Sequence, residues 1–251
     1  MFIPAIFVLA VMETAAGIAS AGTFSRSATT VPLMCDSGKC AAVAVHSPDG
    51  TEEIRRTFVR RSFTWDKYGL NKKMDLNIPH VEVVTPRGRW NLGLEDSTDW
   101  IDMDVLWSPD SKLVALTGEM ASYIETVRVF AISETGPKQL DADMQPTQDM
   151  VRRLRPVCAR YVGRLGCDPD QDEDGLNFAA VAWSDSHTLA LMSEVPCDTM
   201  WGGIMCLAMG YDVDLPSGRI VGTTTPKAFM TRWKQSIPPS FRIPDSPDWN
   251  Q

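Results

Sequence analysis

The chain has 251 residues and a formal net charge of −8. This acidic balance argues against binding to nucleic acid or to an anionic membrane surface, because both carry negative charge. Without the leader described next, about 230 residues remain, which is enough for one substantial domain.

The first 21 residues have the features of an export signal. Residues 2–12 form an apolar run that is too short to cross a bilayer as a helix. Small residues follow, and residues 19–21 (Ala-Ser-Ala) fit a cleavage site before Gly22. No Lys or Arg precedes the run, so a buried N-terminal helix is the alternative. We expect a secreted or periplasmic protein that has no later membrane span.

Six cysteines fall into three local pairs, which fits an oxidising compartment. Short loops cost little entropy to close, so local pairing is the favoured connectivity among the 15 that six cysteines allow. Metal binding is the weaker alternative, because no Cys-x-x-Cys motif occurs. The predicted disulfides are Cys35–Cys40, Cys158–Cys167 and Cys197–Cys206.

Three stretches are similar to one another: 44–51 (AVHSPDGT), 105–112 (VLWSPDSK) and 181–188 (VAWSDSHT). Each has an apolar strand end, a turn rich in Ser, Pro, Asp or Gly, and the start of a second strand. Further alternating or apolar segments at 81–85, 126–133 and 211–215 predict outer strands. The recurrence indicates a repeated β-unit. The basic run Arg55, Arg56, Arg60 and Arg61 is interpreted as decorating a strand edge.

These motifs resemble the blade repeats of WD-repeat and TolB-type β-propellers, in which a W/F-S-P-D-G/S turn joins two inner strands. The first copy departs from the pattern with His46 in place of the aromatic residue, and the third lacks the proline. The resemblance implies an all-β, propeller-like fold of four to five blades, and it covers about half of the mature chain. The spacings of 61 and 76 residues between copies exceed one blade, so an open or distorted propeller and a β-sandwich remain alternatives.

One interval between the repeats predicts a helix instead of a strand. Apolar residues recur at helical spacing over 147–165, with Thr147 as the N-cap, Gly166 as the stop and Pro156 as a kink. Its arginines form either a solvated face or a docking face for an acidic partner. We therefore divide the mature chain into a domain at 22–235 and a Pro-rich tail at 236–251.

An acidic stretch follows the predicted helix and matches the first half of an EF-hand-type calcium loop. Asp170, Asp172 and Asp174 take positions 1, 3 and 5, and the carbonyl of Leu176 takes position 7. Position 12 is Val181, so the bidentate carboxylate is missing. A calcium site and an acidic surface loop are both open interpretations, and we expect no other cofactor.

The remaining candidates carry little chemistry. The acidic cluster at 95–104 is interpreted as the polar face of a strand, and the three histidines are isolated in sequence. No nucleophile elbow, P-loop or dinucleotide fingerprint occurs. The apolar loop with Trp201, Ile204 and Met205 is either a tip that contacts a partner or hairpin packing.

These observations favour an exported, soluble, non-catalytic protein-binding module, for example an envelope inhibitor or an immunity-type protein. We expect it to be a monomer that binds another protein. The alternatives are a carboxylate- or calcium-dependent hydrolase on a propeller scaffold and a structural component of an envelope assembly.

Overall fold

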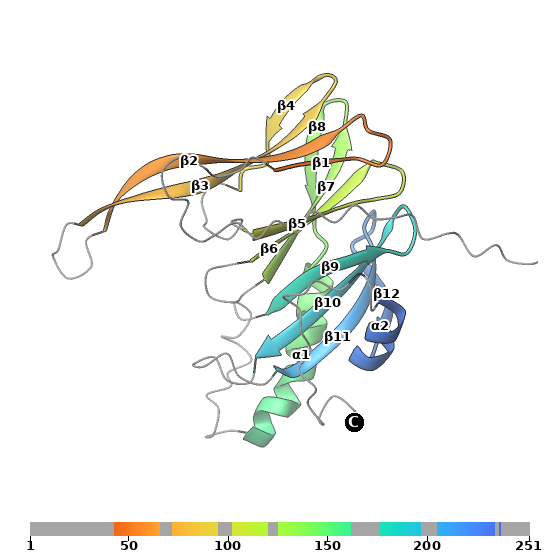
Figure 1. Ribbon diagram of the computed structural model, residues 1–251. Coiled ribbons are helices and arrows are strands. Elements are labelled where there is room, and N and C mark those ends of the chain that lie inside the picture. Colours follow the sequence, from red (N-terminus) through yellow and green to blue (C-terminus); the bar gives the residue numbers. More distant parts are fainter. Residues whose placement is uncertain are drawn as a thin grey trace, which may run out of the picture.

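The computed structural model describes residues 43–65, 72–94, 102–119, 125–161, 176–196, 205–233 and 236. The described part of the chain is mainly β, as predicted, and its strands form three four-stranded antiparallel sheets that follow one another along the chain (Figure 1). The first sheet contains β1 (Val43–His46), β2 (Glu53–Trp65), β3 (Lys72–Thr85) and β4 (Gly88–Asn91). The second contains β5 (Asp102–Trp107), β6 (Leu113–Glu119), β7 (Glu125–Ser133) and β8 (Gly136–Leu140). The third contains β9 (Asn177–Trp183), β10 (Thr188–Pro196), β11 (Met205–Asp214) and β12 (Arg219–Thr224).

Each copy of the repeated sequence motif covers the end of the first strand of a sheet and the turn that leads to the second strand. The hydroxyl of Ser47 donates to Asp49 at 2.7 Å, and that of Ser108 donates to Asp110 at 2.7 Å. In the third copy, Asp185 accepts hydrogen bonds from two backbone amides of its own turn, both at 2.7 Å. Short polar side chains that bond to nearby backbone or to each other stabilise such turns, which is why the motif recurs.

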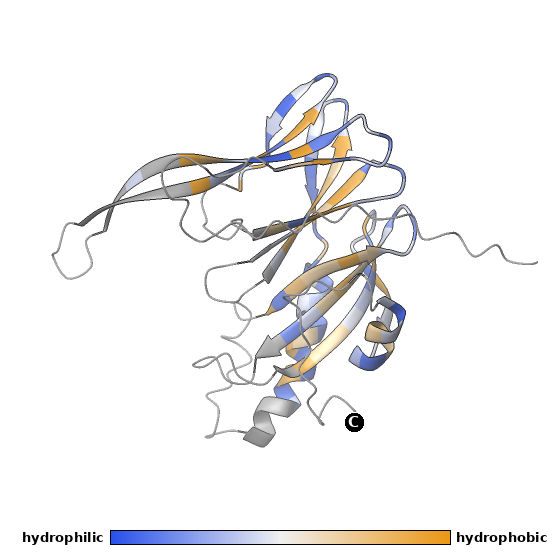
Figure 2. Ribbon diagram, in the orientation of Figure 1, coloured by the Kyte–Doolittle hydropathy of each residue, from blue (hydrophilic) through white to orange (hydrophobic). Residues whose placement is uncertain are grey.

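The second sheet lies between the other two and is buried on both faces. Residues 113–116 (Leu-Val-Ala-Leu) are therefore apolar without alternation, as expected for a strand covered on both sides. Figure 2 shows hydrophobic residues along the strands of the second and third sheets and hydrophilic residues at the turns. The first interface buries Val45, Ile54, Val83, Val105 and Leu116, and the second buries Ala115, Val129, Leu191, Tyr211 and Val213.

The same tryptophan hydrogen bond joins each pair of successive sheets. Trp107 Nε1 donates to the carbonyl oxygen of Val45 at 3.2 Å, and Trp183 Nε1 donates to that of Leu106 at 3.2 Å. Val45 and Leu106 occupy equivalent positions in the repeated motif. Each immediately precedes the residue at the aromatic position of that motif, which is His46 in the first copy and Trp107 in the second. A buried indole N–H needs an acceptor, and the preceding sheet supplies it.

A helix lies where the apolar spacing predicts one. α1 spans Met144–Tyr161 and includes Pro156, and Met150 and Leu154 bury their side chains between the second and third sheets. The predicted N-cap is wrong: the helix begins three residues before Thr147, so that residue lies in the first turn. The predicted end at 165 falls outside the described residues.

Asp149 ties α1 to the third sheet. Its carboxylate accepts hydrogen bonds from Arg153 Nε at 2.6 Å, from Arg152, and from the Tyr211 hydroxyl of β11 at 3.0 Å. Burial opposes ionisation of Asp149, but these three hydrogen bonds outweigh it and hold its pKa below the usual value. The helix is therefore fixed by a charged contact as well as by its apolar face.

A second helix, α2 (Pro226–Trp233), covers the outer face of the third sheet and was not predicted. Phe229 is 2% exposed and lies directly over Gly210, where an added Cβ would be 2.0 Å from Phe229 Cδ2. Arg232 Nη1 donates to Asp212 Oδ2 at 2.9 Å, which fixes the end of the helix. Among the described residues, neither helix has the length and apolar character that crossing a membrane requires.

Candidate functional site

Most residues singled out in the sequence lie outside the part of the chain that the structure describes. Leu176 is buried next to β9, and the backbones of Cys158, Met205 and Cys206 belong to α1 and β11. The leader, the calcium site, the disulfides and the apolar loop therefore stay predictions. Outside the description are residues 1–21, Asp170, Asp172, Asp174, Trp201, Ile204, all of the 236–251 tail except Ser236, and the side chains of Cys35, Cys40, Cys158, Cys167, Cys197 and Cys206.

The paired residues of the β10–β11 hairpin end next to one predicted disulfide pair in the sequence, Cys197 and Cys206. Its last pair is Pro196 opposite Met205, after a bulge. Cys206 follows Met205 within β11, and Cys197, which follows Pro196 in the sequence, lies outside the described residues.

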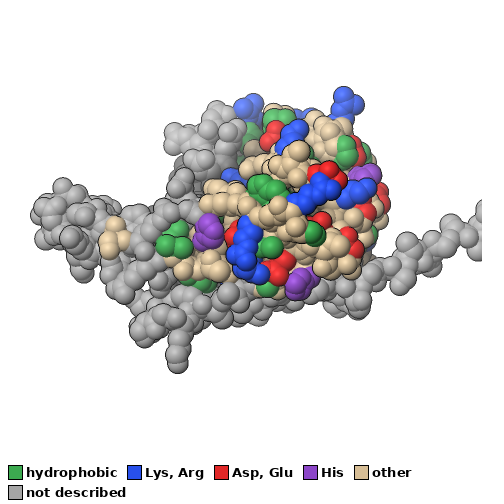
Figure 3. Space-filling view, turned by 90° about the horizontal axis from the view of Figure 1, so that it is seen from above, with side chains coloured by type: hydrophobic (Ala, Val, Ile, Leu, Met, Phe, Trp, Pro, Cys, Tyr) green, Lys and Arg blue, Asp and Glu red, His purple; other side chains and the backbone are tan. Residues whose placement is uncertain are grey.

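The outer face of the first sheet carries a group of charged side chains. The opposite face packs against the second sheet through Val45, Ile54 and Val83. Side chains alternate between the two faces of a strand, so residues such as His46 and Glu53, which the register sets opposite each other, project outward together. Figure 3 views this side of the molecule and shows positive and negative side chains interspersed on it.

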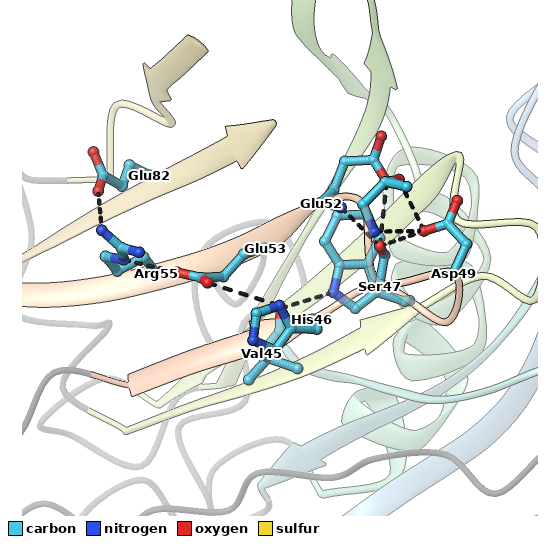
Figure 4. Close-up of polar contacts among 10 residues, drawn as sticks. Val45, His46, Ser47, Asp49, Glu52, Glu53, Arg55 and Glu82 are labelled. Atoms are coloured by element: carbon cyan, nitrogen blue, oxygen red, sulfur yellow. Dashed lines mark hydrogen bonds and ion pairs between the residues drawn. The ribbon is translucent and has the colours of Figure 1, made fainter. Parts of the chain in front are cut away.

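Five side chains form a charged row across the four strands: His46, Glu53, Arg55, Glu82 and Arg89 (Figure 4 shows the first four). Arg55 Nε contacts Glu53 Oε1 at 2.7 Å, and Arg55 Nη1 lies 3.9 Å from Glu82 Oε1. At the two ends, His46 Nδ1 lies 3.7 Å from Glu53 Oε2, and Arg89 Nη1 lies 3.7 Å from Glu82 Oε1. Basic and acidic side chains thus alternate along the whole row.

The acidic side chains of the row are less exposed than the basic side chains at its two ends. The Glu53 and Glu82 side chains are 13% and 14% exposed, whereas His46 and Arg89 are 65% and 63% exposed. The two carboxylates are therefore mostly shielded from solvent, and the His46 and Arg89 side chains at the ends of the row are exposed to it. An ion pair with an exposed partner contributes little to stability, so the two end pairs, both at 3.7 Å, do little to hold the fold.

The turn beside the row is rigid and carries a fixed negative charge. Hydrogen bonds from the Ser47 hydroxyl and the Thr51 backbone lower the pKa of Asp49 to about 2. The Asp49 backbone N–H donates to Ser111 Oγ at 3.2 Å, which anchors the turn to the second sheet. His46 therefore lies at the end of β1, directly before a turn that these hydrogen bonds hold in place (Figure 4).

The structure corrects the interpretation of the basic run in β2. Arg56 is 1% exposed and lies with its guanidinium carbon 5.3 Å from the centre of the Phe58 ring, so it faces the interior and does not decorate an edge. Arg55 points the other way, into the charged row, because neighbouring residues of a strand face opposite sides.

Within the described ranges, no group of three or more His, Cys, Asp or Glu residues is arranged to hold a metal ion. His46 and His80 lie on the first sheet and His187 in a turn of the third, so the structure does not gather the three histidines.

Comparison of the chain with protein-family models, with curated proteins and with solved structures found no match.

Proposed function

We propose that this chain is an exported, soluble protein-binding module without catalytic activity, and that the outer face of the first sheet is part of its binding surface. The charged row on that face carries the proposal. A secreted or periplasmic inhibitor, or an immunity-type protein, is the concrete form that we favour.

The row suits recognition because its charges are ordered before a partner arrives. Glu53 and Glu82 hold Arg55 between them at 2.7 Å and 3.9 Å, so little side-chain freedom is left to lose on binding. The exposed His46 and Arg89 side chains at the two ends leave basic groups that a complementary surface can meet.

We further infer that the three sheets are successive blades of a propeller-like stack. Three observations support this: the same strand order in each sheet, equivalent Ser–Asp turns in the first two, and the tryptophan hydrogen bond repeated from sheet to sheet. The total of four to five blades stays a prediction.

The function is tested with tagged mature protein, starting at Gly22, used to capture partners from envelope and culture-fluid extracts with and without calcium. Mass spectrometry identifies what is retained. We expect one stoichiometric partner, whose activity is then assayed with and without this protein.

Two variants show whether the charged row is the surface used. Arg89→Glu reverses an exposed charge at the end of the row and should release the partner. Arg87→Glu is the matched control, because Arg87 is 56% exposed, lies in the turn between β3 and β4, and pairs with Glu134 of the second sheet and not with the row. Retention of the partner by both variants would remove the row from the binding surface. Recovery of no partner in either condition would overturn the proposal and favour the hydrolase alternative.

A further inference from the structure

The outer face of the third sheet, against which α2 lies in Figure 1, buries a carboxyl group among apolar residues. Glu194 in β10 is 3% exposed. Side chains alternate along a strand, so Glu194 shares this face with Ala190 and Met192, which pack beneath α2. The carboxyl group of Glu194 therefore lies on a face whose other β10 side chains are apolar.

Phe229 of α2 is seated next to this carboxyl group. Its ring lies directly over Gly210, where an added Cβ would be 2.0 Å from Phe229 Cδ2. In the β10–β11 register, Glu194 is opposite Ala208. Gly210 lies two residues farther along the same face of β11, so it is the diagonal neighbour of Glu194, at a distance of about 7–8 Å. α2 therefore helps to keep water away from Glu194.

Within the described elements, no charged group faces Glu194. It lies opposite Asn177 of β9 and Ala208 of β11, and burial alone raises its pKa to about 7. The charged residues that α2 and this face of β11 carry are the paired Asp212 and Arg232, the exposed Lys227, and Asp214, which accepts from Ser217 in the next turn. Ionisation of Glu194 would therefore leave a charge without a counter-charge at the α2 contact.

A second polar group is buried without a partner at the same contact. The Trp233 ring of α2 packs against the apolar cluster of this face, and its Nε1 finds no acceptor among the described residues. Burying a polar group without a hydrogen bond costs free energy, which is recovered when water reaches the group. The seated position of α2 thus holds two polar groups that gain partners when the helix lifts.

We infer that α2 is a strap that opens from the outer face of the third sheet when Glu194 ionises. A charged carboxylate needs water or a cation, and lifting α2 admits water to this face. The helix has eight residues and depends on its packing, so it lifts without unfolding the sheet. This inference does not depend on the proposed function.

The direction of the pH dependence follows from where the proton is held more tightly. The pKa of Glu194 is about 7 in the closed state and returns toward its ordinary value of 4.5 when the strap opens. The closed state is therefore favoured below pH 4.5 and loses this advantage as the pH rises toward 7. The equilibrium constant for opening should rise about 200-fold between pH 4 and pH 8.

Hydrogen exchange of the mature protein measures the opening, followed by NMR as protection factors that correct for the intrinsic effect of pH. The marker is the Phe229 amide, which donates to the Thr225 carbonyl at 2.9 Å. Its protection factor should fall about 200-fold from pH 4 to pH 8 in the wild type. Glu194→Gln should abolish this fall, and the matched control Glu134→Gln, at an exposed side chain, should keep it. At both pH values the Phe229 amide should be at least about tenfold less protected than the amides of β6, which exchange on global unfolding.

The contact between the strap and Glu194 is tested from the helix side. Phe229→Ala removes the ring over Gly210, and Lys227→Ala is the matched control on the exposed side of α2. The carboxyl carbon of Glu194 is titrated by ¹³C NMR in each variant. Phe229→Ala should lower the proton affinity of Glu194 at least about tenfold, because seating of α2 and binding of the proton are linked. Lys227→Ala should change it little.

Four results would overturn the inference: protection of the Phe229 amide that does not change with pH, a fall of the same size in Glu194→Gln, equal protection of the Phe229 and β6 amides, or an unchanged titration of Glu194 in Phe229→Ala. Equal protection would mean that α2 opens only when the whole chain unfolds. These measurements need no partner, so their outcome is separate from that of the extract experiment.

Discussion

Glu194 is a buried carboxyl group that forms no ion pair with a cation in the described part of the chain. It lies in β10 opposite Asn177 and Ala208 and is 3% exposed. Within the described residues, its Oε1 atom has no hydrogen-bond partner. Burial disfavours the charged form and raises the pKa of Glu194 to about 7.

The raised pKa makes folding stability depend on pH in a defined direction. Below about pH 4.5 the carboxyl is protonated in both the folded and the unfolded states, so it carries no penalty. Between about 4.5 and 7 the unfolded chain releases its proton first, so the folded state loses stability as pH rises. Each pKa unit corresponds to about 1.4 kcal/mol, so the full penalty above pH 7 is about 3 kcal/mol.

Glu194→Gln cannot ionise and therefore escapes this penalty. Relative to wild type, we expect its free energy of unfolding to rise by about 3 kcal/mol between pH 4 and pH 8, measured by urea unfolding with tryptophan fluorescence. Any cost of burying the amide is present at both pH values and cancels in the comparison. Glu134→Gln, at a side chain that is 77% exposed, should show no such rise. A difference between Glu194→Gln and wild type that is independent of pH would refute the reasoning.

Three further substitutions probe how the sheets and helices are joined, all by urea unfolding. Gly210→Ala brings a Cβ within 2.0 Å of Phe229 Cδ2 and should cost about 1–3 kcal/mol, less when combined with Phe229→Ala. Trp183→Phe leaves a carbonyl of the second sheet without its donor and should cost about 1–2 kcal/mol; an unchanged stability would show that this bond does not hold the sheets together. Asp149→Asn weakens charged hydrogen bonds, including that from Tyr211, and should cost about 1–3 kcal/mol at neutral pH. Because those bonds lower the pKa of Asp149, this cost should shrink as pH falls below about 4, and a cost that grows on acidification would contradict it.

The features that sequence predicted well are those set by nearby residues. The Ser–Asp turns form between positions two apart, so the motif at 47–49 and 108–110 predicts its own hydrogen bonds. The predicted start of α1 is three residues too late because Thr147 is a residue type typical of helix caps. Pro146 is the better signal, since the first turn of a helix needs no amide hydrogen at that point.

The features that sequence did not predict depend on distant segments. Thr225-Pro226 is a recognisable helix start, but α2 is short and gains its buried surface only when Phe229 meets Gly210 of β11. The charged row depends on the β2–β3 register, which sets Arg55 opposite Glu82 although they are 27 residues apart. A shift of one residue in that register would turn one partner inward, so spacing along the chain cannot predict the contact.

The two ends of the stack of sheets differ in chemistry, and this difference constrains how a partner can approach. The outer face of the third sheet is built from small apolar residues such as Ala179, Ala190 and Ala208, and α2 covers it. The outer face of the first sheet carries the charged row. Packing one outer face directly against the other would bury Arg55 and Glu82 against apolar surface, and the desolvation of such groups outweighs the attraction between them. The three described sheets therefore do not close on one another, and a partner that meets the exposed end of the stack meets a charged face and not an apolar one.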